Sequence, residues 1–183
     1  MIDNTDTRHT IGENMYASFY EIAEDLDLDI YEVLYDTDGK TSNALNVEWI
    51  PDVSKFLHGY CDAFALYLSR ECGYNVIARF VKSEYGEPFL IHAACIVPGG
   101  YVDVRGFTEN LEEMFAEFEE SAEDTLYQLS GEYGEGSCWI EDVEYDTEGF
   151  YDYCMERSGD FDECRYELDE YGAMPFFNDF YVR

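Results

Sequence analysis

Positively charged side chains are scarce in this 183-residue chain. It holds 10 lysine and arginine residues against 42 aspartate and glutamate residues, which gives a formal net charge of −32. Proteins bind the phosphates of nucleic acids and of anionic lipids mainly through lysine and arginine. The composition therefore argues against direct binding to nucleic acid or to a membrane surface. It favours a basic partner, or a high-salt habitat.

Long apolar runs and metal-binding cysteine pairs are also missing. No stretch of about 18 apolar residues is present, so we expect no membrane span. The first six residues, MIDNTD, lack the basic start and apolar stretch of a signal peptide. We therefore expect a cytoplasmic protein (in the host cytoplasm if it is phage-encoded) whose six cysteines are mostly reduced thiols. Without a C-x2-C pair we expect no metal site, and we expect no cofactor.

The residues that are present support one folded domain over 1–183. Hydrophobic residues make up 46% of the chain and aromatic residues 17%, which is enough for a core. We expect a core over about 46–106, preceded by a helix over 11–28 and followed by an acidic extension over 107–183. That extension holds 24 acidic and 3 basic residues. Its many aromatic residues favour short packed helices over a solvated tail.

Hydrophobic spacing predicts an α+β fold. Helical spacing marks residues 60–72, which Gly73 ends, and residues 108–129. Strands are predicted over 75–85, 89–97, 101–105 and 138–145, whereas 30–35 fits either a strand or a short helix. We therefore expect a helix packed on a small antiparallel sheet, with additional acidic helical elements towards the C-terminus.

A cysteine, a histidine and an aspartate follow one another in this core. Cys61 lies at the predicted start of a helix, where unpaired N–H groups and the helix dipole lower a thiol pKa. His92 lies in an otherwise apolar strand, and Asp103 lies on the next strand. In this order the three residue types can serve as a nucleophile, as its base and as the group that orients the base.

The hairpin between the last two strands allows a register prediction. If Pro98 and Gly99 form the centre of a two-residue turn, Val97 pairs with Gly100. His92 then lies diagonally from Asp103 on the same face, within reach of a hydrogen bond. A bulge at the second glycine would change this register. By the same pairing Arg105 lies opposite His92, where we expect an ion-pair partner and not a catalyst.

Three segments carry a resemblance to a known family: Gly59-Tyr60-Cys61-Asp62-Ala63-Phe64-Ala65, His92-Ala93 and Gly99-Gly100-Tyr101-Val102-Asp103. Together, within about 58–106, they resemble the core of transglutaminase-like and papain-like cysteine enzymes. The resemblance implies that Cys61 is the nucleophile, His92 the general base and acid, and Asp103 the residue that orients His92. It also implies a hydrolase or acyltransferase acting on an amide or peptide bond of a protein or peptide substrate.

The chain departs from that family in its oxyanion donor. The glutamine that precedes the cysteine in papain-like proteases has no counterpart here. His58, Asn46 or backbone N–H groups could replace it, and Tyr60 is a further candidate for the cleft wall. The missing glutamine is compatible with an active enzyme and with a protein that keeps the fold but has lost the catalytic activity.

A second function of a different class follows from the charge. Small acidic proteins of phages and mobile elements that block nucleic-acid-binding enzymes, anti-CRISPR inhibitors among them, have similar compositions. Carboxylates spaced like phosphates would occupy a basic groove of such an enzyme. The alternative prediction is therefore a nucleic-acid mimic that blocks a basic partner protein.

Overall fold

The computed structural model describes residues 9–11, 14–16, 19–36, 39–44 and 54–158. Its elements follow one another along the chain as β1 (His9–Ile11), β2 (Asn14–Tyr16), α1 (Phe19–Leu26), α2 (Ile30–Tyr35), α3 (Lys40–Ala44), the 3-10 turn η1 (Ser54–Phe56), α4 (Cys61–Cys72), β3 (Asn75–Ser83), β4 (Phe89–Val97), β5 (Gly100–Asp103), β6 (Gly106–Thr108), α5 (Leu111–Phe115), the 3-10 turn η2 (Ala116–Phe118), α6 (Glu119–Tyr133), β7 (Cys138–Tyr145) and α7 (Thr147–Ser158). The α+β class is therefore confirmed.

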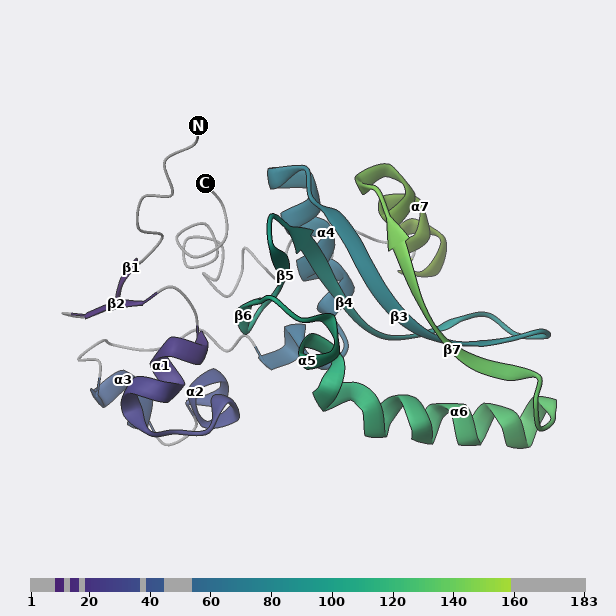
Figure 1. Ribbon diagram of the computed structural model, residues 1–183, viewed down its shortest axis with the longest axis horizontal. Coiled ribbons are helices and arrows are strands. Elements are labelled where there is room, and N and C mark those ends of the chain that lie inside the picture. The colour runs from purple at the N-terminus through teal and green to yellow at the C-terminus, as the bar shows by residue number, and fades with distance from the viewer. Residues whose placement is uncertain (1–8, 12–13, 17–18, 37–38, 45–53, 159–183) are drawn as a thin grey trace.

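A five-stranded antiparallel sheet organises the fold, in the order β6-β5-β4-β3-β7 (Figure 1). Hairpins join β3 to β4, β4 to β5 and β5 to β6. The pair of β5 with β4 has Val97 opposite Gly100 and Cys95 opposite Val102, which is the register predicted from the turn. The β4 strand occupies the centre of the sheet, and the residues in its middle, from His92 to Cys95, are buried.

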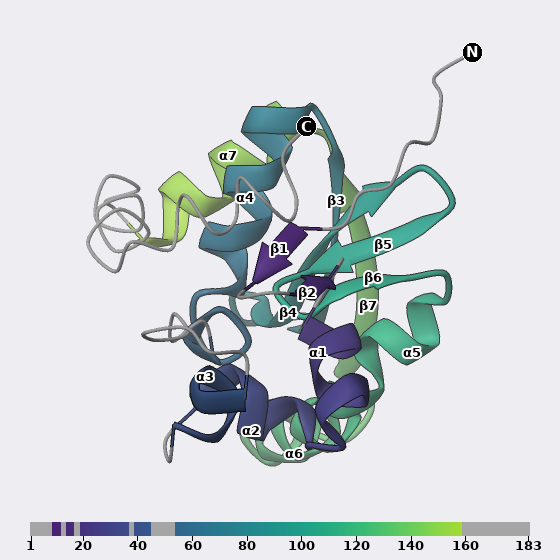
Figure 2. The same ribbon diagram turned by 90° about the vertical axis from the view of Figure 1, so that its left-hand side faces the viewer.

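Helices α4 and α7 lie side by side on one face of the sheet (Figure 2). Helix α4 begins at Cys61 and ends where Gly73 takes a left-handed conformation, as predicted for a glycine after a helix. Its Phe64 and Leu68 are fully buried, and the thiol of Cys95 in β4 donates to the carbonyl of Ala65. Part of the hydrophobic core therefore forms between α4 and the centre of the sheet.

The other face is covered by α5, η2 and α6. One helix over 108–129 was predicted here, and that prediction is wrong. The side chain of Asn110 accepts a hydrogen bond from the Glu112 N–H and starts α5, and a 3-10 turn separates α5 from α6. Because side chains three apart align in such a turn, Phe115 and Phe118 both reach His92. Tertiary packing on the strand thus overrides the helical pattern.

The N-terminal helix is also shorter than predicted. The expected helix over 11–28 is α1 alone, and residues His9–Ile11 and Asn14–Tyr16 form a two-stranded antiparallel hairpin. Gly12 disfavours a helix interior, and Thr10 and Tyr16 favour strands, which accounts for the difference. The undecided segment 30–35 is the helix α2, whose N-cap Asp29 and Glu32 form a capping box.

Parts of two predicted regions lie outside the described residues: 46–53 of the expected core and 159–183 of the acidic extension. The described part of that extension contains the predicted strand, which is β7, and the helix α7. Among the described helices, none has the length and apolar character needed to cross a membrane.

Candidate functional site

His92 and Asp103 meet at the centre of the sheet. Nε2 of His92 in β4 and Oδ2 of Asp103 in β5 lie 2.9 Å apart, and both side chains are almost completely buried. The hairpin register places the two residues diagonally on neighbouring strands, as the sequence predicted. The structure therefore brings together two of the three residues expected in the site.

Aromatic rings enclose the His92 imidazole. The ring of Phe118 stacks on it at a centroid distance of 4.0 Å, and the ring of Phe115 contacts it edge-on. Burial lowers the pKa of His92, and this outweighs the hydrogen bond to Asp103, which acts in the opposite direction. The neutral imidazole is thus favoured. Its second nitrogen, Nδ1, is buried and has no hydrogen-bond partner among the described residues.

Asp103 is held by Arg105 as well as by His92. The Arg105 guanidinium lies 2.6 Å from Oδ2 through Nη2, and Nε contacts both carboxylate oxygens. The backbone N–H of Arg105 also donates to Oδ1, at 2.8 Å. Burial raises the pKa of Asp103, but the hydrogen bond from His92 and the charge of Arg105 outweigh it, so the pKa is lowered. The carboxylate is therefore ionised although it is buried.

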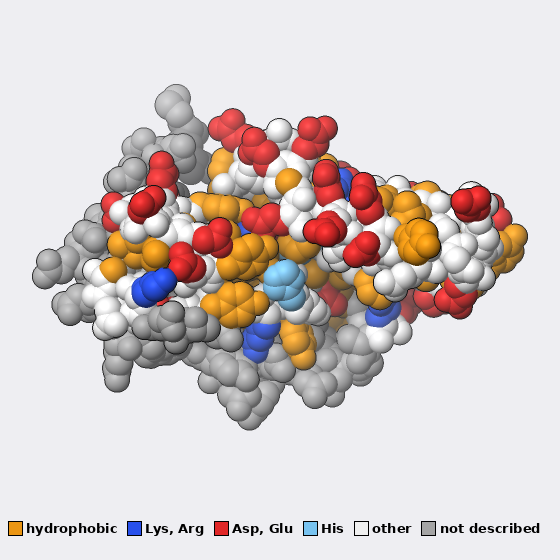
Figure 3. Space-filling model, turned by 90° about the horizontal axis from the view of Figure 1, so that it is seen from below, with side chains coloured by type: hydrophobic (Ala, Val, Ile, Leu, Met, Phe, Trp, Pro, Cys, Tyr) orange, Lys and Arg blue, Asp and Glu red, His pale blue; other side chains and the backbone are white. Residues whose placement is uncertain are grey.

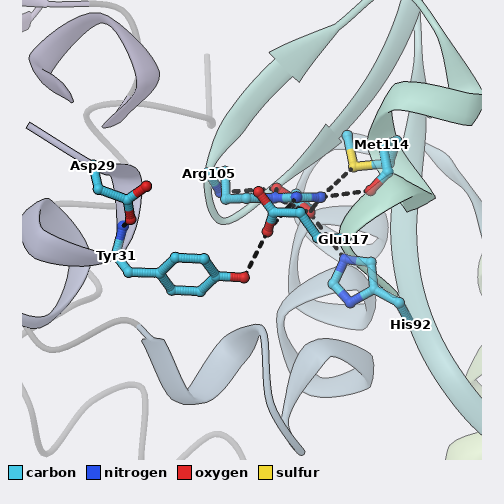
Figure 4. A network of polar contacts seen from close by, with 7 residues as sticks. Asp29, Tyr31, His92, Arg105, Met114 and Glu117 are labelled. Atoms are coloured by element: carbon cyan, nitrogen blue, oxygen red, sulfur yellow. Dashed lines mark hydrogen bonds and ion pairs between the residues drawn. The ribbon is translucent and has the colours of Figure 1, made fainter. Parts of the chain in front are cut away.

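Arg105 extends the network outwards to the N-terminal helices (Figure 4). Its Nη1 lies 3.1 Å from Oε2 of Glu117 in η2, and its Nη2 donates to the backbone carbonyl of Met114. Glu117 in turn accepts a hydrogen bond from the Tyr31 hydroxyl of α2. A continuous polar chain therefore runs from the buried histidine to the partly exposed Glu117 and Tyr31.

Cys61 is the first residue of α4, as predicted, but its thiol is closed off. Its exposed fraction is 4%, and burial raises its pKa to about 12, helped by the charge of Asp62. The backbone N–H groups of Ala93 and Asp62 act in the opposite direction. The prediction that the helix start lowers this pKa is wrong for this conformation, because loss of hydration outweighs the N–H groups. No hydrogen bond joins the sulfur to Nδ1 of His92.

The remaining candidates lie at the rim of this centre. His58 and Tyr60 are exposed, in the connection between η1 and α4. The His58 ring stacks on Tyr31 at 6.2 Å and lies 6.4 Å from the Phe118 ring. His58 therefore approaches the aromatic enclosure of His92 from the solvent side. Asn46 lies outside the described residues.

Glu117 and Phe118 were not predicted from the sequence as parts of the network, whereas Arg105 was predicted without its burial. Glu117 and Phe118 sit in the 3-10 turn that the single-helix prediction hid. Arg105 was predicted as an ion-pair partner, and its pair with Asp103 is present, but both side chains are only 1% exposed. The signal available for Arg105 was its place opposite His92 in the predicted hairpin.

Within the described residues, no group of three or more His, Cys, Asp or Glu side chains is arranged to hold a metal ion. Comparisons with protein-family models, with curated proteins and with solved structures find no match.

Proposed function

We propose that this protein is a cysteine-dependent hydrolase or acyltransferase that acts on an amide or peptide bond through Cys61, His92 and Asp103. The observation that supports this most directly is the difference between the surroundings of the two ring nitrogens of His92. Asp103 holds Nε2, and Nδ1 has no hydrogen-bond partner in the part of the chain that the structure describes. A base needs one nitrogen fixed by an orienting group and the other free for the nucleophile.

The chemistry follows from this arrangement. The Cys61 thiol gives its proton to Nδ1 of His92, and the sulfur attacks the carbonyl carbon of the substrate. His92 returns the proton to the leaving amine, and a thioester remains on Cys61. Water or an acceptor amine then cleaves the thioester with His92 as the base. Backbone N–H groups near the sulfur, that of Ala93 among them, are available to stabilise the oxyanion.

Access to the sulfur is the condition for this activity. Cys61 is buried in the conformation described, and burial is the largest reason for its raised pKa. Opening of the site towards a substrate would remove that effect and would leave the two N–H groups to favour the thiolate. The proposal therefore predicts that Cys61 reacts through opening of a local region and not through global unfolding.

Labelling with iodoacetamide, followed by peptide mass spectrometry, tests this. Cys95 is the matched control, because it is fully buried and its pKa is also raised by burial. We expect Cys61 to be labelled faster than Cys95 under native conditions, and we expect His92→Ala to slow the labelling of Cys61 alone. Equal labelling of both cysteines at the rate of global unfolding would overturn the proposal.

The charge distribution supports a second candidate, a protein that blocks a basic nucleic-acid-binding partner. Helix α6 carries five carboxylates and no lysine or arginine, and carboxylates spread across the face seen in Figure 3. Several basic side chains are engaged within the molecule, among them Arg79 with Asp142 and Lys82 with Glu141. The carboxylates of α6 are exposed, so their negative charge is available to a partner.

Pull-down on a basic nuclease over a range of salt concentrations tests this candidate. Binding should weaken steeply as salt rises, since opposite charges at an exposed interface are screened. A variant with Glu119, Glu120, Glu123 and Asp124 changed to their amides should bind more weakly at every salt concentration. Absence of binding even at low salt would exclude this function.

A further inference from the structure

The Arg105 guanidinium is the most buried positive charge of the described residues. Its side chain is 1% exposed, and three of its contacts are with the Asp103 carboxylate, at 2.6 to 3.2 Å. One of the two carboxylate oxygens that it holds, Oδ2, is also the oxygen that faces Nε2 of His92. The orientation of this oxygen is therefore shared between the arginine and the histidine.

Arg105 is itself fixed from several directions (Figure 4). Glu117 contacts Nη1, the backbone carbonyl of Met114 accepts from Nη2, and the Phe118 ring lies 5.3 Å from the guanidinium carbon. A planar group with partners at both of its ends has one orientation available, in contrast to a lysine ammonium. The guanidinium is thus held rigidly against Asp103.

We infer that Arg105 is a positioning residue of the site: its guanidinium fixes the Asp103 carboxylate, which directs Nε2 of His92 to Asp103 and leaves Nδ1 free for Cys61. The inference rests on the proposed function for its catalytic meaning. The effect of Arg105 on His92 through Asp103 can be measured without any assay of activity. The measured quantity is the protonation of the two ring nitrogens of His92.

Arg105 also sets the charge that His92 experiences. The charges that act on His92 are those of Asp103 and Arg105 from the β5–β6 hairpin and that of His58 from the connection between η1 and α4. Arg79 lies opposite His92 on β3, and Glu117 of η2 contacts Arg105. The Cys61 thiol lies near the backbone N–H of Ala93, the residue after His92. Asp103 raises the pKa of His92, while the charges of Arg105 and His58 lower it. Loss of the Arg105 charge should therefore raise the pKa of His92.

The experiment is an NMR titration of the histidine ring nitrogens in the full-length protein and in Arg105→Gln and Arg105→Lys. In the unaltered protein we expect one neutral form of His92, with the proton on Nε2. Arg105→Gln should move the titration midpoint to higher pH and slow the labelling of Cys61 on the order of a hundredfold, the cost of a misplaced catalytic group. Arg105→Lys keeps the charge without the planar fork. It should restore the midpoint but not the labelling rate.

Arg79→Gln is the matched control, because Arg79 lies opposite His92 on β3 but pairs with Asp142. It should shift the ring signals of His92 much less than Arg105→Gln does. A folded Arg105→Gln protein with unaltered His92 signals would overturn the inference. An Arg105→Lys protein that labels Cys61 at the unaltered rate would overturn it as well. The second test applies even if Arg105→Gln does not fold. Slow labelling of Cys61 in the unaltered protein, with shifted His92 signals in Arg105→Gln, would instead overturn the proposed function alone.

Discussion

The centre of the sheet and the helix α6 use charge in opposite ways. Around Asp103, three charged or titratable side chains are almost fully buried, and each contacts a partner of complementary character. Along α6, the carboxylates face solvent and the single fully buried side chain is that of Ala122. The first region is a small polar network inside the core, and the second is a solvated acidic surface.

This difference shows where the structure depends on individual residues. A buried charge that loses its partner keeps the cost of its lost hydration, whereas an exposed charge is hydrated and screened. Substitutions at the centre should therefore have large effects on stability, and substitutions on α6 small ones. The predictions that follow test this contrast.

The largest effect is expected for Asp103→Ala. The change leaves the Arg105 guanidinium buried without its main partner, which should lower the free energy of unfolding by about 3–5 kcal/mol. Urea unfolding followed by circular dichroism measures it. The control is Asp142→Ala, which breaks the more exposed pair with Arg79 and should cost at most about 1 kcal/mol. Similar costs for the two variants would remove the contrast.

Gly100→Ala tests the close packing of the hairpins. A Cβ atom at this position would lie 2.2 Å from the backbone carbonyl oxygen of Thr108 and 2.8 Å from the Phe107 ring. The β6 strand would have to move, at a cost of about 1–3 kcal/mol. Thermal unfolding should show a lowered melting temperature. An unchanged melting temperature would mean that β5 and β6 are not packed as described.

Acid should weaken the centre of the sheet first. The pKa of His92 is lowered in the folded state, so below about pH 6.5 the unfolded chain takes up a proton that the folded protein does not. Stability should therefore fall with pH below that value, with a slope of at most about 1.4 kcal/mol per pH unit from this group. The lowered pKa of Asp103 adds a further loss in stronger acid.

Unfolding in urea at a series of pH values measures this dependence. His92→Gln should remove the part that begins near the histidine pKa, whereas the exposed His58→Gln should retain it. A His92→Gln protein with the same acid dependence as the unaltered chain would contradict the assignment.

The smallest effect, and one of opposite sign, is expected on α6. Gly131 lies in the helix, and a Cβ atom there would meet nothing within 4 Å. Gly131→Ala should therefore raise the free energy of unfolding by about 0.5–1 kcal/mol, because alanine loses less conformational freedom than glycine on folding. A loss of stability, measured by urea unfolding, would show that α6 is more tightly packed than described.

The hairpin around the candidate site could be predicted from the sequence because its signals are local. The apolar run of β4 ends at Pro98 and Gly99, and these two residues fix the pairing of Val97 with Gly100. Residue alternation along the strands then places His92 beside Asp103. The helix α4 was equally clear, since Phe64, Ala65, Leu68 and Cys72 recur at helical spacing in the sequence and Gly73 ends the helix.

The rest of the site depends on contacts between distant segments. The 3-10 turn Ala116–Phe118 accompanies the packing of Phe115 and Phe118 on His92, and no local pattern in 108–129 predicts that contact. The contact of Glu117 with Arg105 depends on the same turn. The raised pKa of Cys61 likewise follows from how completely neighbouring elements cover it, which a position at a helix start does not reveal.

The two-residue turn between β4 and β5 has a consequence for how this chain can vary over evolutionary time. Insertion or deletion of a single residue there would rotate the following strand by half a turn, so that Asp103 would point to the opposite side. Replacement of the turn residues by others that tolerate the same backbone would preserve the pairing. Across descendants of this gene, the length of that turn should therefore be more constant than its composition.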